Sequence, residues 1–143
     1  MIGPGDIVDD DDLPGTGNTL LGVVTAGFYS AAHPSALNKE YVAAYGKANG
    51  HRANFISVGG YDGMHLIYAA LKKTGGKADG DSLIAAMKGM AWESPRGPMS
   101  IDPETRDVIQ NIYVRKVEKK NGQLYNVEFQ TFENVKDFGK IKK

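Results

Sequence analysis

The sequence predicts an α/β fold in which three helices and a few short strands precede a C-terminal β-hairpin. Apolar residues at helical spacing over 37–48 and 64–71 indicate amphipathic helices. Two alternating segments flank Asn121-Gly122, a dipeptide that favours the tight turn of a hairpin. Between these regions, the prolines of residues 93–107 exclude a continuous helix.

The first 30 residues are expected to contain strand ends and a long loop. Met1-Ile2 is interpreted as the end of a buried strand, and residues 3–19, rich in Gly, Asp and Pro, as a loop. Residues 23–29 begin with Val, Val and Thr, whose β-branched side chains favour a strand.

The first helix is expected to begin after Ser35, which can cap it, and to stop at Asn49-Gly50. One face of this helix carries apolar and aromatic side chains at three- and four-residue spacing, which indicates a buried stripe. This stripe comprises Leu37, Tyr41, Tyr45 and Ala48.

A second and a third helix are expected after a short apolar segment at 55–58. Asp62 would cap the second helix, which would run to Lys73 and stop at Gly75-Gly76. Asp81 or Ser82 would cap the third helix. The apolar stripe of the second helix comprises Met64, Ile67, Tyr68 and Leu71.

Residues 93–107 are interpreted as a turn, a short strand and a second turn, followed by hairpin strands over 112–118 and 124–132. The second hairpin strand alternates apolar and polar side chains, so we expect the apolar set to be buried and the polar set to face water. The apolar set is Tyr125, Val127 and Phe129, and the polar set is Asn126, Glu128 and Gln130.

The composition excludes several classes of function. Seventeen basic residues balance 17 acidic ones among the 143, so no electrostatic footprint for nucleic acid is present. The absence of cysteine excludes disulfides and thiolate chemistry. No apolar run is long enough for a membrane span, and the first residues lack the features of a signal peptide. Because the chain opens on what looks like the end of a strand, we expect it to be a piece of a longer protein.

The sequence contains no recognisable catalytic or cofactor motif. A nucleophile elbow and a phosphate-binding loop are both missing. The histidines His33, His51 and His65 lack the spacing of a zinc site. The acidic run 9–12 lacks the alternating ligands of a calcium loop. We expect no enzyme activity, no cofactor and no metal.

Two turns carry the candidate binding residues. Tyr61 and Asp62 follow a pair of glycines, and they can be a core tyrosine with a helix cap or the wall of a ligand cleft. The turn Gly3-Pro4-Gly5-Asp6 could place the Asp6 carboxylate and free backbone N–H groups at a cleft edge.

Several of these segments, taken in order, resemble the C-terminal part of a periplasmic solute-binding protein of the branched-chain amino acid (Leu/Ile/Val) type. Such proteins serve ABC importers and have the type I periplasmic binding fold. The resemblance covers nearly the whole chain and depends on order and spacing. It rests on residues 3–6, 38–45, 60–63, 75–76, 94–98 and 101–103.

The resemblance implies two α/β lobes with the ligand between them. Residues 1–30 would belong to the second lobe and a crossover, and residues 31–118 would supply helices and the turn-rich segment of the first lobe. Residues 119–143 would form a hairpin strand and a tail near the hinge. The same resemblance implies a periplasmic location and a membrane permease as partner, with no nucleic acid. The alternative is a ligand-sensing domain of a regulator or receptor with the same fold.

The resemblance also bears on the ligand. In amino-acid-binding members, an acidic residue directly after a Gly-Pro pair holds the ligand's ammonium group. Here that position is Gly5, and the acid follows as Asp6. We therefore expect a small carboxylic acid, aromatic or otherwise, with a branched-chain amino acid left open. The expected ligand-binding residues in this chain are Asp6, Tyr61 and Asp62.

The chain lacks the strands against which its helices would pack in the family. The apolar stripes of the first two helices would then face water, and such a patch is usually covered by a partner. We expect a homodimer of this piece. The alternative is a rearrangement in which the helices fold over the hairpin.

Overall fold

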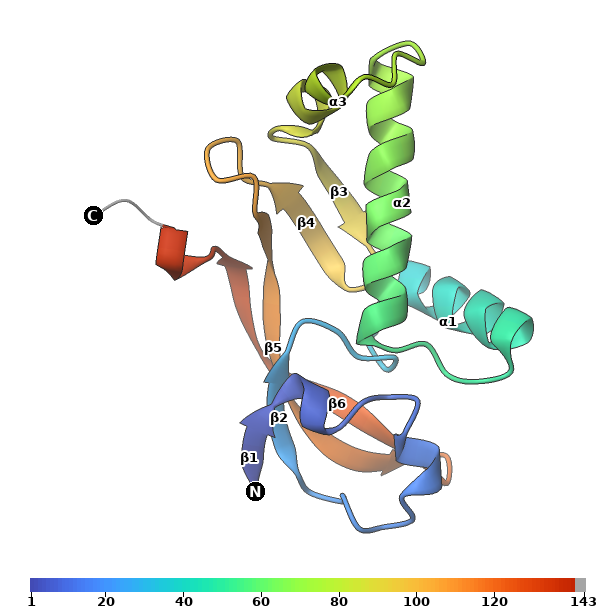
Figure 1. The fold of residues 1–143 in the computed structure, drawn as a ribbon. Coiled ribbons are helices and arrows are strands. Elements are labelled where there is room, and N and C mark those ends of the chain that lie inside the picture. Colours follow the sequence, from blue (N-terminus) through green and yellow to red (C-terminus); the bar gives the residue numbers. More distant parts are fainter. Residues whose placement is uncertain (141–143) are drawn as a thin grey trace.

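In the computed structural model, which describes residues 1–140, the chain forms a six-stranded sheet with three α-helices (Figure 1). This arrangement confirms the predicted α/β class. The strands are β1 (Ile2–Pro4), β2 (Val24–Gly27), β3 (Ala91–Ser94), β4 (Gly97–Ile101), β5 (Val108–Lys120) and β6 (Gln123–Val135). The helices are α1 (Ala36–Asn49), α2 (Phe55–Lys73) and α3 (Gly80–Met87). Residues 141–143, at the end of the expected tail, lie outside the described residues.

The long strand β5 joins the two ends of the molecule. The sheet order is β1-β2-β5-β4-β3, with β6 paired to β5. The first part of β5 pairs with β4 and its later part pairs with β2, both in antiparallel register, while β1 and β2 run parallel. Helices α2 and α3 therefore lie with β3 and β4 at one end, and β1 and β2 lie at the other (Figure 1).

The hairpin forms where the sequence predicts it. Asn121 and Gly122 have φ values of 51° and 84°, the left-handed pair that a two-residue hairpin turn requires. The strands on either side are longer than expected. Next to the hairpin, a small core at the β1–β2 end contains Val8, Leu13, Val23, Val117 and Leu124.

The most buried residues of β6 do not belong to the predicted apolar set, of which Tyr125 and Val127 are half-buried. Leu124 and Asn126 are buried, whereas Phe129 is 60 % exposed. The Asn126 Nδ2 donates to the Val8 carbonyl at 3.0 Å, and the backbone carbonyl of Asn126 accepts from the Ser30 hydroxyl. These two hydrogen bonds tie the Leu124–Asn126 side of β6 to the N-terminal segment.

The predicted start of α2 at Asp62 is wrong. The helix begins at Phe55, after Asn54, whose side chain accepts from the Ser57 N–H while the Ser57 hydroxyl accepts from the Asn54 N–H. This reciprocal cap lies eight residues before the predicted one, so Asp62 lies within the helix. The stop before Gly75-Gly76 is confirmed, since α2 ends at Lys73.

Two further details differ from the expectation. The cap of α3 is Asp79, whose carboxylate accepts from the Ser82 N–H at 3.0 Å, and not Asp81 or Ser82. Strand β3 was not expected. It pairs with β4 across a tight turn, so the proline-rich segment forms a hairpin of its own.

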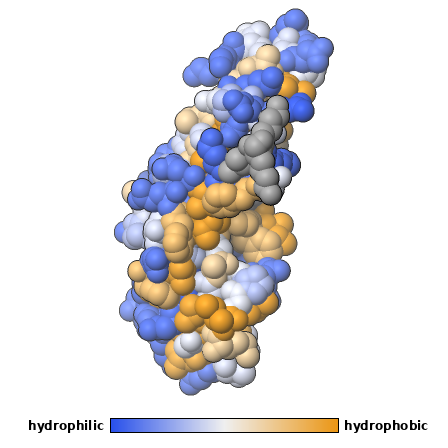
Figure 2. Space-filling model, turned by 90° about the vertical axis from the view of Figure 1, so that its left-hand side faces the viewer, coloured by the Kyte–Doolittle hydropathy of each residue, from blue (hydrophilic) through white to orange (hydrophobic). Residues whose placement is uncertain are grey.

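The apolar stripe of α2 faces water in the described chain, as expected. Met64, Ile67 and Tyr68 are 45 %, 39 % and 64 % exposed. On α1, in contrast, Tyr41 and Tyr45 are half-buried, with ring centroids 5.9 Å apart. Figure 2 shows a further face, on which apolar residues gather over the lower half of the molecule. Within residues 1–140, no helix is long and apolar enough to cross a membrane.

Candidate functional site

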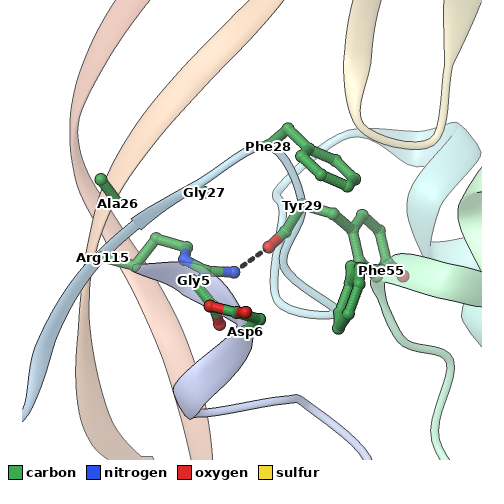
Figure 3. A pocket seen from close by; sticks show the side chains of 8 residues that line it. All are labelled: Gly5, Asp6, Ala26, Gly27, Phe28, Tyr29, Phe55 and Arg115. Atoms are coloured by element: carbon green, nitrogen blue, oxygen red, sulfur yellow. Dashed lines mark hydrogen bonds between the residues drawn. The ribbon is translucent and has the colours of Figure 1, made fainter. Parts of the chain in front are cut away.

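A cavity of about 280 Å³ lies between the β1–β2 end of the molecule and the start of α2 (Figure 3). It is formed by the turn after β1, the segment that leaves β2, the first residue of α2, and the middle of β5. Its walls are partly aromatic and its floor carries a guanidinium group. The lining residues are Gly5, Asp6, Ala26, Gly27, Phe28, Tyr29, Phe55 and Arg115.

The Arg115 guanidinium forms the floor of the cavity and is held by oxygen atoms from several segments. Its Nη1 donates to the Tyr29 carbonyl, and its Nη2 donates to the Gly5 carbonyl and to the Thr25 hydroxyl, both at 3.1 Å. Arg115 is only 3 % exposed, and this burial lowers its pKa. Its Nε–H has no hydrogen-bond partner among residues 1–140.

Two glycines allow the backbone to approach this guanidinium. A Cβ atom at Gly5 would lie 2.6 Å from the Arg115 Nη2, and one at Gly27 would lie 2.8 Å from it. Both distances are shorter than van der Waals contact, so any larger residue would displace the arginine. The glycines therefore keep the cation next to the cavity.

Aromatic rings form the opposite wall. The rings of Phe28 and Phe55 meet edge to face, with centroids 6.1 Å apart. Tyr29 is buried, and its hydroxyl donates to the Asn38 Oδ1 at 3.1 Å. Figure 3 shows Phe28, Tyr29 and Phe55 on one side and Arg115 with Asp6 on the other. The cavity thus combines apolar rings with a buried positive charge.

The structure places the residues proposed from the sequence in two separate locations. Asp6 is exposed and lines the cavity. Tyr61 is half-buried on α2, with its ring 5.2 Å from that of Tyr41, and does not line the cavity. Asp62 is 4 % exposed and forms an ion pair with Arg96, with 2.7 Å between Oδ2 and Nε.

Phe28, Phe55 and Arg115 were not identified from the sequence. One signal was available for Arg115. It lies two residues from Tyr113 and two from Val117, so the three share one face of β5. All three side chains are at most 3 % exposed. An arginine on the buried face of a strand requires partners, so it is a candidate for a functional or structural site.

A buried carboxylate lies close to this site. Asp10 is 1 % exposed, and its Oδ2 accepts from the Ala31 N–H at 3.1 Å. Burial raises the pKa of Asp10 to about 6, although the Ala31 N–H and the charge of Arg115 oppose the shift. The carboxylate therefore destabilises the fold when it is ionised.

We expect this effect to appear as a pH dependence of stability. The pKa of Asp10 rises from 3.8 to about 6 on folding, so its favourable contribution is complete below pH 3.8 and is lost as the pH rises through 6. The loss amounts to about 3 kcal/mol. Asp10→Asn lacks this titrating carboxyl group. The difference in free energy of unfolding between Asp10→Asn and the parent, measured in urea between pH 4 and 7, should therefore increase in favour of the variant by about that amount as the pH rises. A difference that does not change with pH would contradict the assignment.

The part of the chain that the structure describes has no group of three or more His, Cys, Asp or Glu side chains that could hold a metal ion.

The comparisons with known proteins identify the family. The profile of the periplasmic binding protein family matches residues 1–123, and the chain belongs to that family. A curated relative, Leu/Ile/Val-binding protein homolog 6 of Brucella abortus (strain 2308), is 49 % identical over 142 residues. That alignment covers 97 % of this chain and 36 % of the relative, so the chain spans little more than a third of the relative's length.

Solved structures of ABC-transporter solute-binding proteins are similar over nearly the whole chain. One from Rhodopseudomonas palustris BisB5, in complex with 3,4-dihydroxybenzoic acid, is 72 % identical with a TM-score of 0.95, covering 97 % of this chain and 38 % of that one. Another, from R. palustris HaA2 in complex with p-hydroxybenzoic acid, is 44 % identical with a TM-score of 0.91, covering 99 % and 39 %. The predicted resemblance is confirmed. These comparisons give no support to the expected homodimer.

Proposed function

We propose that the complete protein is the periplasmic receptor of an ABC importer and that it binds an aromatic carboxylic acid. The observation that carries this proposal is the cavity between Phe28, Phe55 and Arg115. The rings suit a flat apolar ligand, and the guanidinium suits an anion. The Arg115 hydrogen bonds go to carbonyl and hydroxyl oxygens, so the guanidinium is not hydrogen-bonded to a carboxylate of this chain among the described residues.

The relatives favour an aromatic acid over a branched-chain amino acid. Two relatives that share 72 % and 44 % of their aligned residues with this chain are in complex with hydroxylated benzoic acids. The Brucella relative carries a Leu/Ile/Val-binding name, which keeps an amino acid as the alternative. Gly5 occupies the position at which an amino-acid-binding member would carry its ammonium-binding acid.

The proposal extends to the rest of the protein. Residues 1–30 belong to the second lobe and its crossover, 31–118 to the first lobe, and 119–143 to the hinge region. The cavity then lies at the opening between the lobes, and the remaining chain completes it. The exposed stripe of α2 packs against the remainder of the first lobe in place of a second copy. The partner is the membrane permease, and the protein has no catalytic role.

A thermal-shift screen of the complete protein tests the ligand class. A ligand that binds only the native state raises the melting temperature, by several degrees at 100 times its Kd. We expect stabilisation by 4-hydroxybenzoate and 3,4-dihydroxybenzoate and none by leucine or valine at equal concentration. Stabilisation by leucine or valine alone would overturn the assignment.

A further inference from the structure

A buried arginine supports the aromatic wall of the cavity from behind. The guanidinium carbon of Arg96 lies 4.7 Å from the centroid of the Phe28 ring, over its face. Arg96 is not among the residues that line the cavity, whereas Phe28 is. The arginine therefore acts on the cavity through the phenyl ring that it stacks against.

Hydrogen bonds from its N–H groups hold the Arg96 guanidinium in place. Its Nε donates to the Asp62 carboxylate at 2.7 Å, and its Nη1 donates to the Gln110 side chain. Asp62 is held in turn by the Trp92 indole N–H at 3.2 Å. Arg96 is 8 % and Asp62 is 4 % exposed, so water does not compete for these contacts. The two hydrogen bonds from Arg96 orient the planar group over the Phe28 ring.

The backbone of Arg96 is anchored as well. Its carbonyl accepts from the Tyr113 hydroxyl at 2.7 Å, and Tyr113 is on the same buried face of β5 as Arg115. Strand β5 therefore anchors Arg96, which supports Phe28, and also carries Arg115 at the floor of the cavity.

We propose that Arg96 is a positioning residue that fixes the Phe28 ring and so makes the cavity selective for flat aromatic acids over non-planar acids of equal charge. The inference rests on the proposed function. It gives Asp62 an indirect role, because the carboxylate orients the guanidinium that supports the ring. Arginine is required, since lysine would keep the charge but lacks the planar group that stacks on a ring.

Calorimetric titration of the complete protein with benzoate and with cyclohexanecarboxylate measures this selectivity. The two acids have the same charge and similar size, but only benzoate is flat. In Arg96→Lys, which keeps a cation beside Asp62, we expect the affinity for benzoate to fall by about tenfold, comparable to the loss of one aromatic contact. The affinity for cyclohexanecarboxylate should change by less than about threefold. Leu124→Ala, which disturbs the separate core, should leave the ratio of the two affinities unchanged.

A measurement without ligand separates this inference from the proposed function. With 4-fluorophenylalanine incorporated at position 28, the ¹⁹F resonance should shift and broaden in Arg96→Lys and stay unchanged in Leu124→Ala. An unchanged resonance in Arg96→Lys, or an equal loss of affinity for both acids, would overturn the positioning role. If the parent binds neither acid, the proposed function fails, and the fluorine resonance alone decides the role of Arg96.

Discussion

Replacement of Arg115 by Met is expected to weaken the binding of 4-hydroxybenzoate by about 100-fold. The substitution removes the positive charge at the floor of the cavity, and a hydrogen bond or contact with a charged group contributes about 1.5–3 kcal/mol. The same change leaves the Tyr29 and Gly5 carbonyls and the Thr25 hydroxyl without their donor. We therefore also expect the free energy of unfolding to fall by about 3 kcal/mol. Calorimetry and urea unfolding of the complete protein measure the two effects.

Two controls distinguish loss of the charge from loss of the fold. Arg115→Lys keeps a positive charge but lacks the planar guanidinium whose N–H groups reach several oxygens. It should therefore retain more affinity than Arg115→Met. Leu124→Ala removes a buried side chain of the neighbouring core and should lower stability by about 2–5 kcal/mol without a comparable loss of affinity. Binding by Arg115→Met that equals the parent's would remove Arg115 from the site.

Replacement of Arg96 by Met is expected to lower the free energy of unfolding by about 3–5 kcal/mol. Asp62 is 4 % exposed, and its carboxylate would lose its cation while staying in a buried position. A buried charge without its partner is strongly destabilising, whereas loss of both charges is much less so. Urea unfolding of the complete protein at pH 7 measures the change.

The double variant Asp62→Asn with Arg96→Met provides the matched test. The new amide at position 62 would keep an oxygen for the Trp92 indole N–H, so the double variant should recover at least half of the lost stability.

An exposed ion pair serves as a second control. Lys77→Met breaks an ion pair in which the lysine is 70 % exposed, and we expect almost no change in the free energy of unfolding. A loss as small as this in Arg96→Met would show that the buried pair is not required.

Local signals account for the parts of the fold that the sequence predicts well. Asn121-Gly122 determines the hairpin turn, and Gly75-Gly76 follows the end of α2, because both depend on backbone conformations encoded by adjacent residues. The start of α2 was missed because two glycines after Val58 suggested a turn. The Asn54–Ser57 cap, which is also local, could have corrected that expectation.

A long-range contact accounts for a second feature that was missed. The buried side of β6 depends on Asn126 reaching the Val8 carbonyl, a contact between residues 118 positions apart. Alternation alone indicates two faces but not which of them meets the rest of the chain. The prediction was therefore wrong for Asn126, which is buried, and for Phe129, which is exposed.

The candidate site was predictable only in part. Asp6 follows a turn after a strand, and the structure places it at the edge of the cavity. Asp62 was noticed for its position after glycines, yet its surroundings depend on Arg96, 34 residues later. The cavity itself requires Gly5, Phe28 and Arg115 to meet, and no local pattern in the sequence encodes such a meeting.

Calorimetric titration of the complete protein with 4-hydroxybenzoate, followed by leucine, tests the central claim most directly. The combination of aromatic walls and a buried guanidinium predicts saturable binding of the aromatic acid with one ligand per protein and no detectable heat of binding for leucine. Saturable binding of leucine together with no binding of 4-hydroxybenzoate would contradict an aromatic-acid receptor.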